Sequence, residues 1–133
     1  MLLRVLYSIF AILTLINGIW MLAAPESWYK DLPAGVPDTG PYNGHFIRDL
    51  GLVFVLIAAG FFWCAARLHQ SKPVLLVITI FFVGHAILHV VDLLQSRLPH
   101  SHWRMDTPAV FFPAILLIIL LCVPIRNRSD VAN

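Results

Sequence analysis

The chain has 133 residues, of which 59% are hydrophobic and 12% are charged, and its formal net charge is +2. Soluble domains carry about 25% charged residues, so this composition indicates an integral membrane protein. The small and dispersed net charge argues against nucleic-acid binding. The length suits one compact unit, and we expect residues 1–133 to form a single membrane domain.

Four apolar runs, taken in chain order, predict an all-α fold in which four helices cross the membrane as a bundle. The runs cover residues 2–24, 46–66, 73–94 and 107–123. Each is close to the roughly 20 residues that cross about 30 Å of hydrocarbon. The first run is longer than the apolar core of a signal peptide, and Pro25 follows it directly, so we expect an uncleaved helix. The fourth run is short, and Pro113 within it predicts a kink.

Two long connections, residues 25–45 and 95–106, lie on the same side of the predicted bundle. The first is rich in Pro and Gly and contains PESWYKDL, for which we expect a short helix at the membrane surface. Its Trp and Tyr side chains suit the headgroup boundary. A connection of about 20 residues is longer than most, and long loops are often functional.

The charged residues predict the orientation of the four spans. The side that holds both termini and the 67–72 turn carries five of the nine Lys and Arg residues, and Asp130 is its single acidic residue. The other six acidic residues belong to the side with the long connections. Because Lys and Arg mark the cytoplasmic side, we predict an N-in, C-in protein of the bacterial inner membrane, with the long connections facing the periplasm.

A polar cluster interrupts this apolar pattern in the sequence VGHAILHVVD of the third run. His85, His89 and Asp92 are spaced i, i+4, i+7 and therefore share one helix face. His45 and Asp49 share the first turns of the second run, at about the same depth. Ionisable groups inside a membrane cost ~2.5 to 3.5 kcal/mol near its centre and usually mark function. We therefore expect these five side chains to form one site near the outer face.

A transition-metal site is the first interpretation of this cluster, with His45, Asp49, His85, His89 and Asp92 as ligands. Imidazole and carboxylate groups bind copper, iron or zinc. A second set of candidate ligands, ranked below the first, comes from the outer connection: His100, His102 and Asp106. The polar network around the site would include Arg48 and Asn17. The protein would then handle metal or act as a redox or accessory subunit of a membrane enzyme. Whether it is itself an enzyme stays open, because no residue pattern identifies a substrate.

Two further interpretations stay open. In the first, the polar cluster holds no metal and fixes the helix register, relays protons or binds a quinone-like molecule. In the second, His45 and His89 hold a b-type haem between facing helices, whereas covalent haem is excluded because the chain lacks C-x-x-C-H. The expected partners are membrane lipid and another membrane subunit or a second copy of the chain.

The first half of the chain resembles a known group of proteins. The stretch LRVLYSIFAILTLINGIWMLAAPESWY contains Gly18, Pro25 and Trp28, and the stretch RDLGLVFVLIAAG begins with Arg48 and contains Gly51. This pattern resembles the DoxX-like group of small four-helix bacterial membrane proteins. The resemblance implies the four-helix architecture and, at most, a subunit of a quinone-linked membrane oxidoreductase. It implies nothing about the histidines of the third run.

Overall fold

A computed structural model describes residues 1–124 of the chain and shows helices without strands in this part. Its elements are α1 (Leu2–Ala23), α2 (Pro25–Asp31), η1 (Val36–Thr39), α3 (Gly44–Ala66), η2 (Leu68–Gln70), α4 (Ser71–Leu94), α5 (His102–Met105), η3 (Thr107–Phe111) and α6 (Phe112–Cys122). The all-α prediction is confirmed for these residues. Arg126, Arg128 and Asp130, which contributed to the predicted orientation, lie outside the described residues.

Three helices are long and apolar enough to cross a membrane, and they correspond to the first three predicted runs. They cover Leu2–Ala23, Gly44–Ala66 and Leu68–Leu94, whereas the fourth apolar helix, Thr107–Cys122, is shorter. The fourth run begins as a π-helix, in which the N–H groups of Val110 and Phe111 both donate to the carbonyl of Asp106. The prolines at 108 and 113 lack an N–H donor, which explains the irregular start of this helix.

The helix ends follow local capping chemistry. The second run begins two residues earlier than expected, at Gly44, because the Asn43 side chain accepts a hydrogen bond of 3.1 Å from the backbone N–H of Phe46. The expected short helix at PESWYKDL is confirmed as α2, with Pro25 at its first position.

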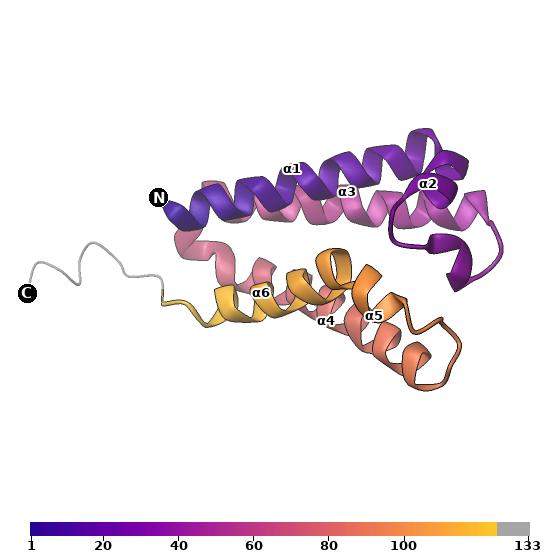
Figure 1. The fold of residues 1–133 in the computed structure, drawn as a ribbon. Coiled ribbons are helices and arrows are strands. Elements are labelled where there is room, and N and C mark those ends of the chain that lie inside the picture. Colours follow the sequence, from indigo (N-terminus) through magenta and orange to yellow (C-terminus); the bar gives the residue numbers. More distant parts are fainter. Residues whose placement is uncertain (125–133) are drawn as a thin grey trace, which may run out of the picture.

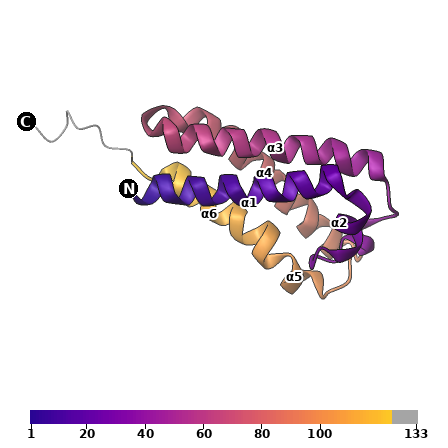
Figure 2. The ribbon, with the colours of Figure 1, turned by 90° about the horizontal axis from the view of Figure 1, so that it is seen from above.

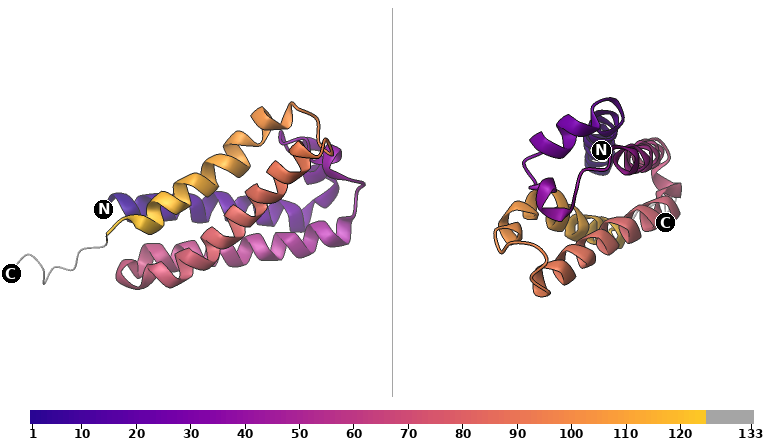
Figure 3. Two further views of the ribbon diagram at one scale, coloured as in Figure 1. Left: turned by 90° about the horizontal axis from the view of Figure 1, so that it is seen from below. Right: turned by 90° about the vertical axis from the view of Figure 1, so that its right-hand side faces the viewer.

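The helices form two pairs that diverge toward one end of the molecule (Figure 1). Helices α1 and α3 pack closely where Gly18 meets Gly51, because a Cβ atom on Gly18 would lie 2.9 Å from the carbonyl oxygen of Gly51. Helices α4 and α6 form the second pair, which runs obliquely to the first in the views from above and below (Figures 2 and 3). We call the end with α2 and α5 the loop end, and the end with the α3–α4 turn the turn end.

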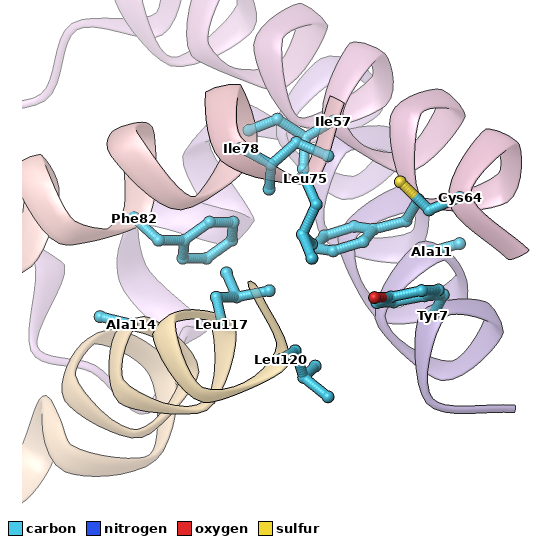
Figure 4. Close-up of a cluster of buried hydrophobic side chains, with 11 residues drawn as sticks. Tyr7, Ala11, Ile57, Cys64, Leu75, Ile78, Phe82, Ala114, Leu117 and Leu120 are labelled. Atoms are coloured by element: carbon cyan, nitrogen blue, oxygen red, sulfur yellow. The ribbon is translucent and has the colours of Figure 1, made fainter. Parts of the chain in front are cut away.

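The main hydrophobic core lies between the two pairs (Figure 4). Tyr7 of α1, Phe61 of α3, Leu75 of α4 and Leu117 of α6 are all buried within it. A smaller cluster of Met21, Trp28 and Ile47 holds α2 against α1 and α3 at the loop end. The packing therefore joins α1, α3, α4 and α6 through one core, while connecting segments bridge the diverging ends.

Candidate functional site

Four ionisable side chains form a continuous hydrogen-bonded chain at the loop end. The Nδ1 atom of His89 donates to Asp106 Oδ2 at 2.7 Å, and the Nδ1 atom of His102 donates to Asp106 Oδ1 at 3.1 Å. The Nε2 atom of His102 lies 3.1 Å from Asp38 Oδ2. We call Asp38, His102, Asp106 and His89 the His–Asp chain. It links three segments that are far apart in the sequence: η1, α5 with its following residue, and α4.

The two central side chains of the His–Asp chain are the most buried, and Asp38 at its outer end is the most exposed. The side chains of His102 and Asp106 are fully buried, and that of His89 is 16% exposed. The Asp38 side chain is 47% exposed. The His–Asp chain therefore runs from the protein surface at Asp38 to His89, a mostly buried side chain of α4. Helix α4 is long and apolar enough to span a membrane.

Local backbone structure positions these side chains. His102 and Asp106 are four residues apart, and the short helix α5 puts both on one face, with the Asp106 N–H donating to the His102 carbonyl. Gly35 allows η1 to lie against them, because its φ of 62° is left-handed and a Cβ there would lie 3.1 Å from the His102 ring. A larger residue at 35 would push Asp38 away from His102.

The two carboxylates determine the charge of His102. Burial of the ring by itself lowers its pKa, but hydrogen bonds to Asp38 and Asp106, together with their negative charges, outweigh this effect. The pKa of His102 is therefore raised above its ordinary value. A protonated ring between two carboxylates uses both nitrogens as donors, so His102 acts as a bridge in the chain rather than as a free metal ligand.

The two histidines of α4 lie side by side at the inner end of the His–Asp chain. The ring centroids of His85 and His89 are 4.6 Å apart in an edge-on arrangement, and Phe81 stacks on His85 at 6.3 Å. Because Asp106 engages Nδ1 of His89, the neutral ring carries no proton on Nε2, which is then an acceptor.

An apolar groove of about 380 Å³ begins next to these rings, between α3 and α4. Its lining residues are Val53, Leu56, Ile57, Gly60, Val74, Val77, Ile78 and Phe81. Phe81 therefore contacts both the groove and the His85 ring. Phe81 and the His85 ring thus connect the groove to His89, the member of the His–Asp chain on α4.

The structure does not bring the α3 candidates to this region. The side chains of His45 and Asp49 are 89% and 59% exposed, and they pair with each other at 3.4 Å. The loop-end termini of α3 and α4 lie apart because the helix pairs diverge there (Figure 3). The arrangement of His45 and His89 on facing helices, on which the haem interpretation depends, is therefore not found.

The remaining candidate site residues lie outside the His–Asp chain. Asp92 pairs with Arg97 at 3.1 Å at the end of α4, and His100 is exposed. Asn17 accepts a hydrogen bond of 2.9 Å from Trp28 Nε1 and so belongs to the cluster that holds α2. Arg48 is exposed, and its guanidinium lies 3.5 Å from the Gly44 carbonyl.

His102 and Asp106, the loop residues ranked below the other candidate ligands, form the centre of the His–Asp chain. Asp38 was not predicted as a site residue. The signal for Asp38 was an acidic residue in an unusually long Pro- and Gly-rich connection. Among residues 1–124, no three His, Cys, Asp or Glu side chains are placed to hold a metal ion together.

Comparison with known proteins does not identify a relative. No protein-family model, curated protein or solved structure matches the chain significantly. The resemblance to the DoxX-like group therefore stays a prediction, and the chemistry of the His–Asp chain is the basis for assigning a function.

Proposed function

We propose that this protein crosses the bacterial inner membrane four times, with both termini in the cytoplasm, and binds a quinone-like molecule. A partner oxidoreductase subunit would supply the two electrons that reduce the quinone to a quinol, and the His–Asp chain would relay the two protons that the quinol takes up. The carrying observation is the buried Asp106 carboxylate, which joins His89 inside α4 to His102 and the surface. Thr107–Cys122 would be the fourth span, and it is about 24 Å long at 1.5 Å per residue.

The path of hydrogen bonds supports proton transfer. Its four members alternate carboxylate and imidazole, two groups that pass protons along a hydrogen-bonded path by donating and accepting in turn. The half-exposed Asp38 carboxylate puts one end of the path in contact with water, and the buried side chains of His102 and Asp106 continue it inward. Ionisable groups within membrane spans commonly mark such relays.

The side chains near His89 suit a lipophilic ligand whose ring carries polar substituents. The apolar groove suits a hydrocarbon tail, and Phe81 offers an aromatic face. The imidazoles of His85 and His89 supply hydrogen-bonding nitrogens at the end of the groove. Quinone carbonyls accept a hydrogen bond from an N–H of His85, and from Nε2 of His89 when the His–Asp chain has delivered a proton to it, so one molecule suits both the groove and the two imidazoles.

A binding experiment tests this proposal with the full chain in detergent. Decylubiquinone, a short-tailed quinone, is titrated while the fluorescence of the four tryptophans is followed. We expect saturable quenching, with the dissociation constant raised about tenfold or more by Asp106→Asn and by His89→Gln, which corresponds to about 1.4 kcal/mol or more. The matched control His45→Gln changes an exposed histidine at the same end and should leave binding unchanged. Equal affinities in all four proteins, or no saturable binding, would refute the proposal.

A metal site on α4 is the second candidate. Asp106 holds Nδ1 of His89, as carboxylates commonly do for histidines that bind metals through the other nitrogen, and His85 lies one turn away. Copper, iron or zinc would need its further ligands from water or from a partner subunit. Elemental analysis of the purified protein should find about one equivalent of metal that is lost in His85→Ala/His89→Ala. No bound metal in the wild type after incubation with each ion would exclude this candidate.

A further inference from the structure

A hollow of about 210 Å³ lies at the turn end, opposite the His–Asp chain. It is lined by Arg4, Ala66, Arg67, Leu68, His69 and Gln70. Two of these side chains, Arg4 and Arg67, carry positive charge, and His69 adds an imidazole. The start of α1 lies beside the turn between α3 and α4 (Figure 1), and residues of both line the hollow.

The arginines in this hollow are held by two different contacts. Arg4 donates from Nη1 to the carbonyls of Ala65 at 3.1 Å and Ala66 at 3.5 Å, which offsets the negative end of α3. The Arg67 guanidinium lies over the Trp63 ring, 5.9 Å from its centroid. Within residues 1–124 the Arg67 guanidinium donates no hydrogen bond, so its N–H groups are available to an anion.

The surrounding charge also favours an anion. All six acidic residues that the structure describes belong to α2, η1, the start of α3, the end of α4 or the residue after α5, far from this hollow. Lys72 follows the lining residues in the chain and adds a further positive charge at the turn end. Gln70, which lines the hollow, is the N-cap of α4, so the positive end of that helix dipole lies here.

The apolar surroundings indicate that the anion comes from a membrane. Trp63 is 49% exposed, and Leu2 and Phe62 are 72% and 42% exposed beside the basic residues. An amphipathic tryptophan next to exposed apolar side chains suits the boundary between headgroups and acyl chains. A phosphate held in the hollow would therefore have room for its acyl chains along the helices.

We infer that this hollow binds the phosphate group of an acidic phospholipid in the leaflet at the turn end. Arginine binds phosphate oxygens through pairs of N–H groups, and basic pockets at helix ends recognise lipid headgroups. Arg67 is the principal contact, Arg4 supplies charge while it caps α3, and His69 adds a third donor. This site is independent of the proposed function, because it shares no residue with the His–Asp chain or the groove.

Calorimetric titration of the full chain in a neutral detergent tests the inference with soluble short-chain lipids. We expect dihexanoyl phosphatidylglycerol to bind saturably, and dihexanoyl phosphatidylcholine, which has no net charge, to bind at least tenfold more weakly. Arg67→Gln should weaken phosphatidylglycerol binding at least tenfold while the Arg4 cap and the thermal unfolding temperature stay unchanged. The matched control Arg97→Gln removes an exposed arginine at the loop end and should have no effect.

Further titrations distinguish a phospholipid from free phosphate as the source of the bound phosphate. Inorganic phosphate should compete at least tenfold more weakly than phosphatidylglycerol, and His69→Gln should weaken lipid binding by a smaller factor than Arg67→Gln. Equal affinities for inorganic phosphate and the lipid would overturn the lipid assignment. Equal binding of both lipids, or unchanged binding in Arg67→Gln, would overturn the site itself.

Discussion

Replacement of Asp106 by alanine removes the carboxylate that joins His89 to His102. The Asp106 side chain is fully buried and accepts hydrogen bonds of 2.7 Å and 3.1 Å from the two imidazoles. A hydrogen bond to a charged group contributes about 1.5–3 kcal/mol, and breaking a buried ion pair by removing one partner costs about 3–5 kcal/mol. Because His102 keeps Asp38 as a second partner, we expect a loss near the lower limit, about 3 kcal/mol.

The assay is reversible unfolding of the full chain in mixed micelles of increasing sodium dodecyl sulfate content, followed by circular dichroism. Asp92→Ala is the matched control, because its carboxylate is 37% exposed and its pair with Arg97 contributes about 0–1 kcal/mol. A double-mutant cycle with His102→Ala should show that the two losses are not additive. A loss below about 1 kcal/mol for Asp106→Ala, equal to that of the control, would refute the assignment of Asp106 as the centre of the chain.

Three further predictions follow from the packing and the charges. Gly18→Ala should lower stability by about 1–3 kcal/mol, because the new Cβ would lie 2.9 Å from a backbone oxygen of α3; Gly84→Ala, whose Cβ meets nothing within 4 Å, should not be destabilising in the same unfolding assay. Asn43→Ala should cost about 1 kcal/mol through loss of the α3 cap, whereas retention of full stability would show that the cap is dispensable. The raised pKa of His102 predicts a contribution to stability that is complete below its unfolded pKa of about 6.5 and is lost as pH rises through the folded pKa. Asp38→Asn should make stability in this pH range depend less on pH, and an unchanged pH profile would contradict the bridge between the two carboxylates.

The lengths of the apolar runs were enough to predict the helical class of the protein. Hydropathy is a property of consecutive residues, so the three long helices appear in the structure close to their predicted bounds. The short helix α2 was also predictable, because Pro25 and the amphipathic residues after it are local signals. The π-helical start of the fourth run depends on two prolines and on how the Asp106 carbonyl is shared, which hydropathy does not describe.

The helix face that His85 and His89 share was predictable, but the partners of that face were not. Helical periodicity correctly puts His85 and His89 on one face of α4, where their rings meet. It does not determine which neighbouring segment that face contacts, and the expected partners His45 and Asp49 lie exposed on α3 instead. Only the packing of the helix pairs decides this, because it sets their rotation and their divergence at the loop end.

The centre of the site depends most strongly on tertiary structure. Asp38 and His102 are 64 residues apart and meet because η1 docks on α5 at the left-handed Gly35. Hydrogen bonds of this kind form only once both segments are placed by the cores around them, such as that of Met21, Trp28 and Ile47. The sequence by itself therefore determined a helical protein with three helices long and apolar enough to span a membrane and with ionisable groups near their ends, and the tertiary structure selected which of those groups form the His–Asp chain.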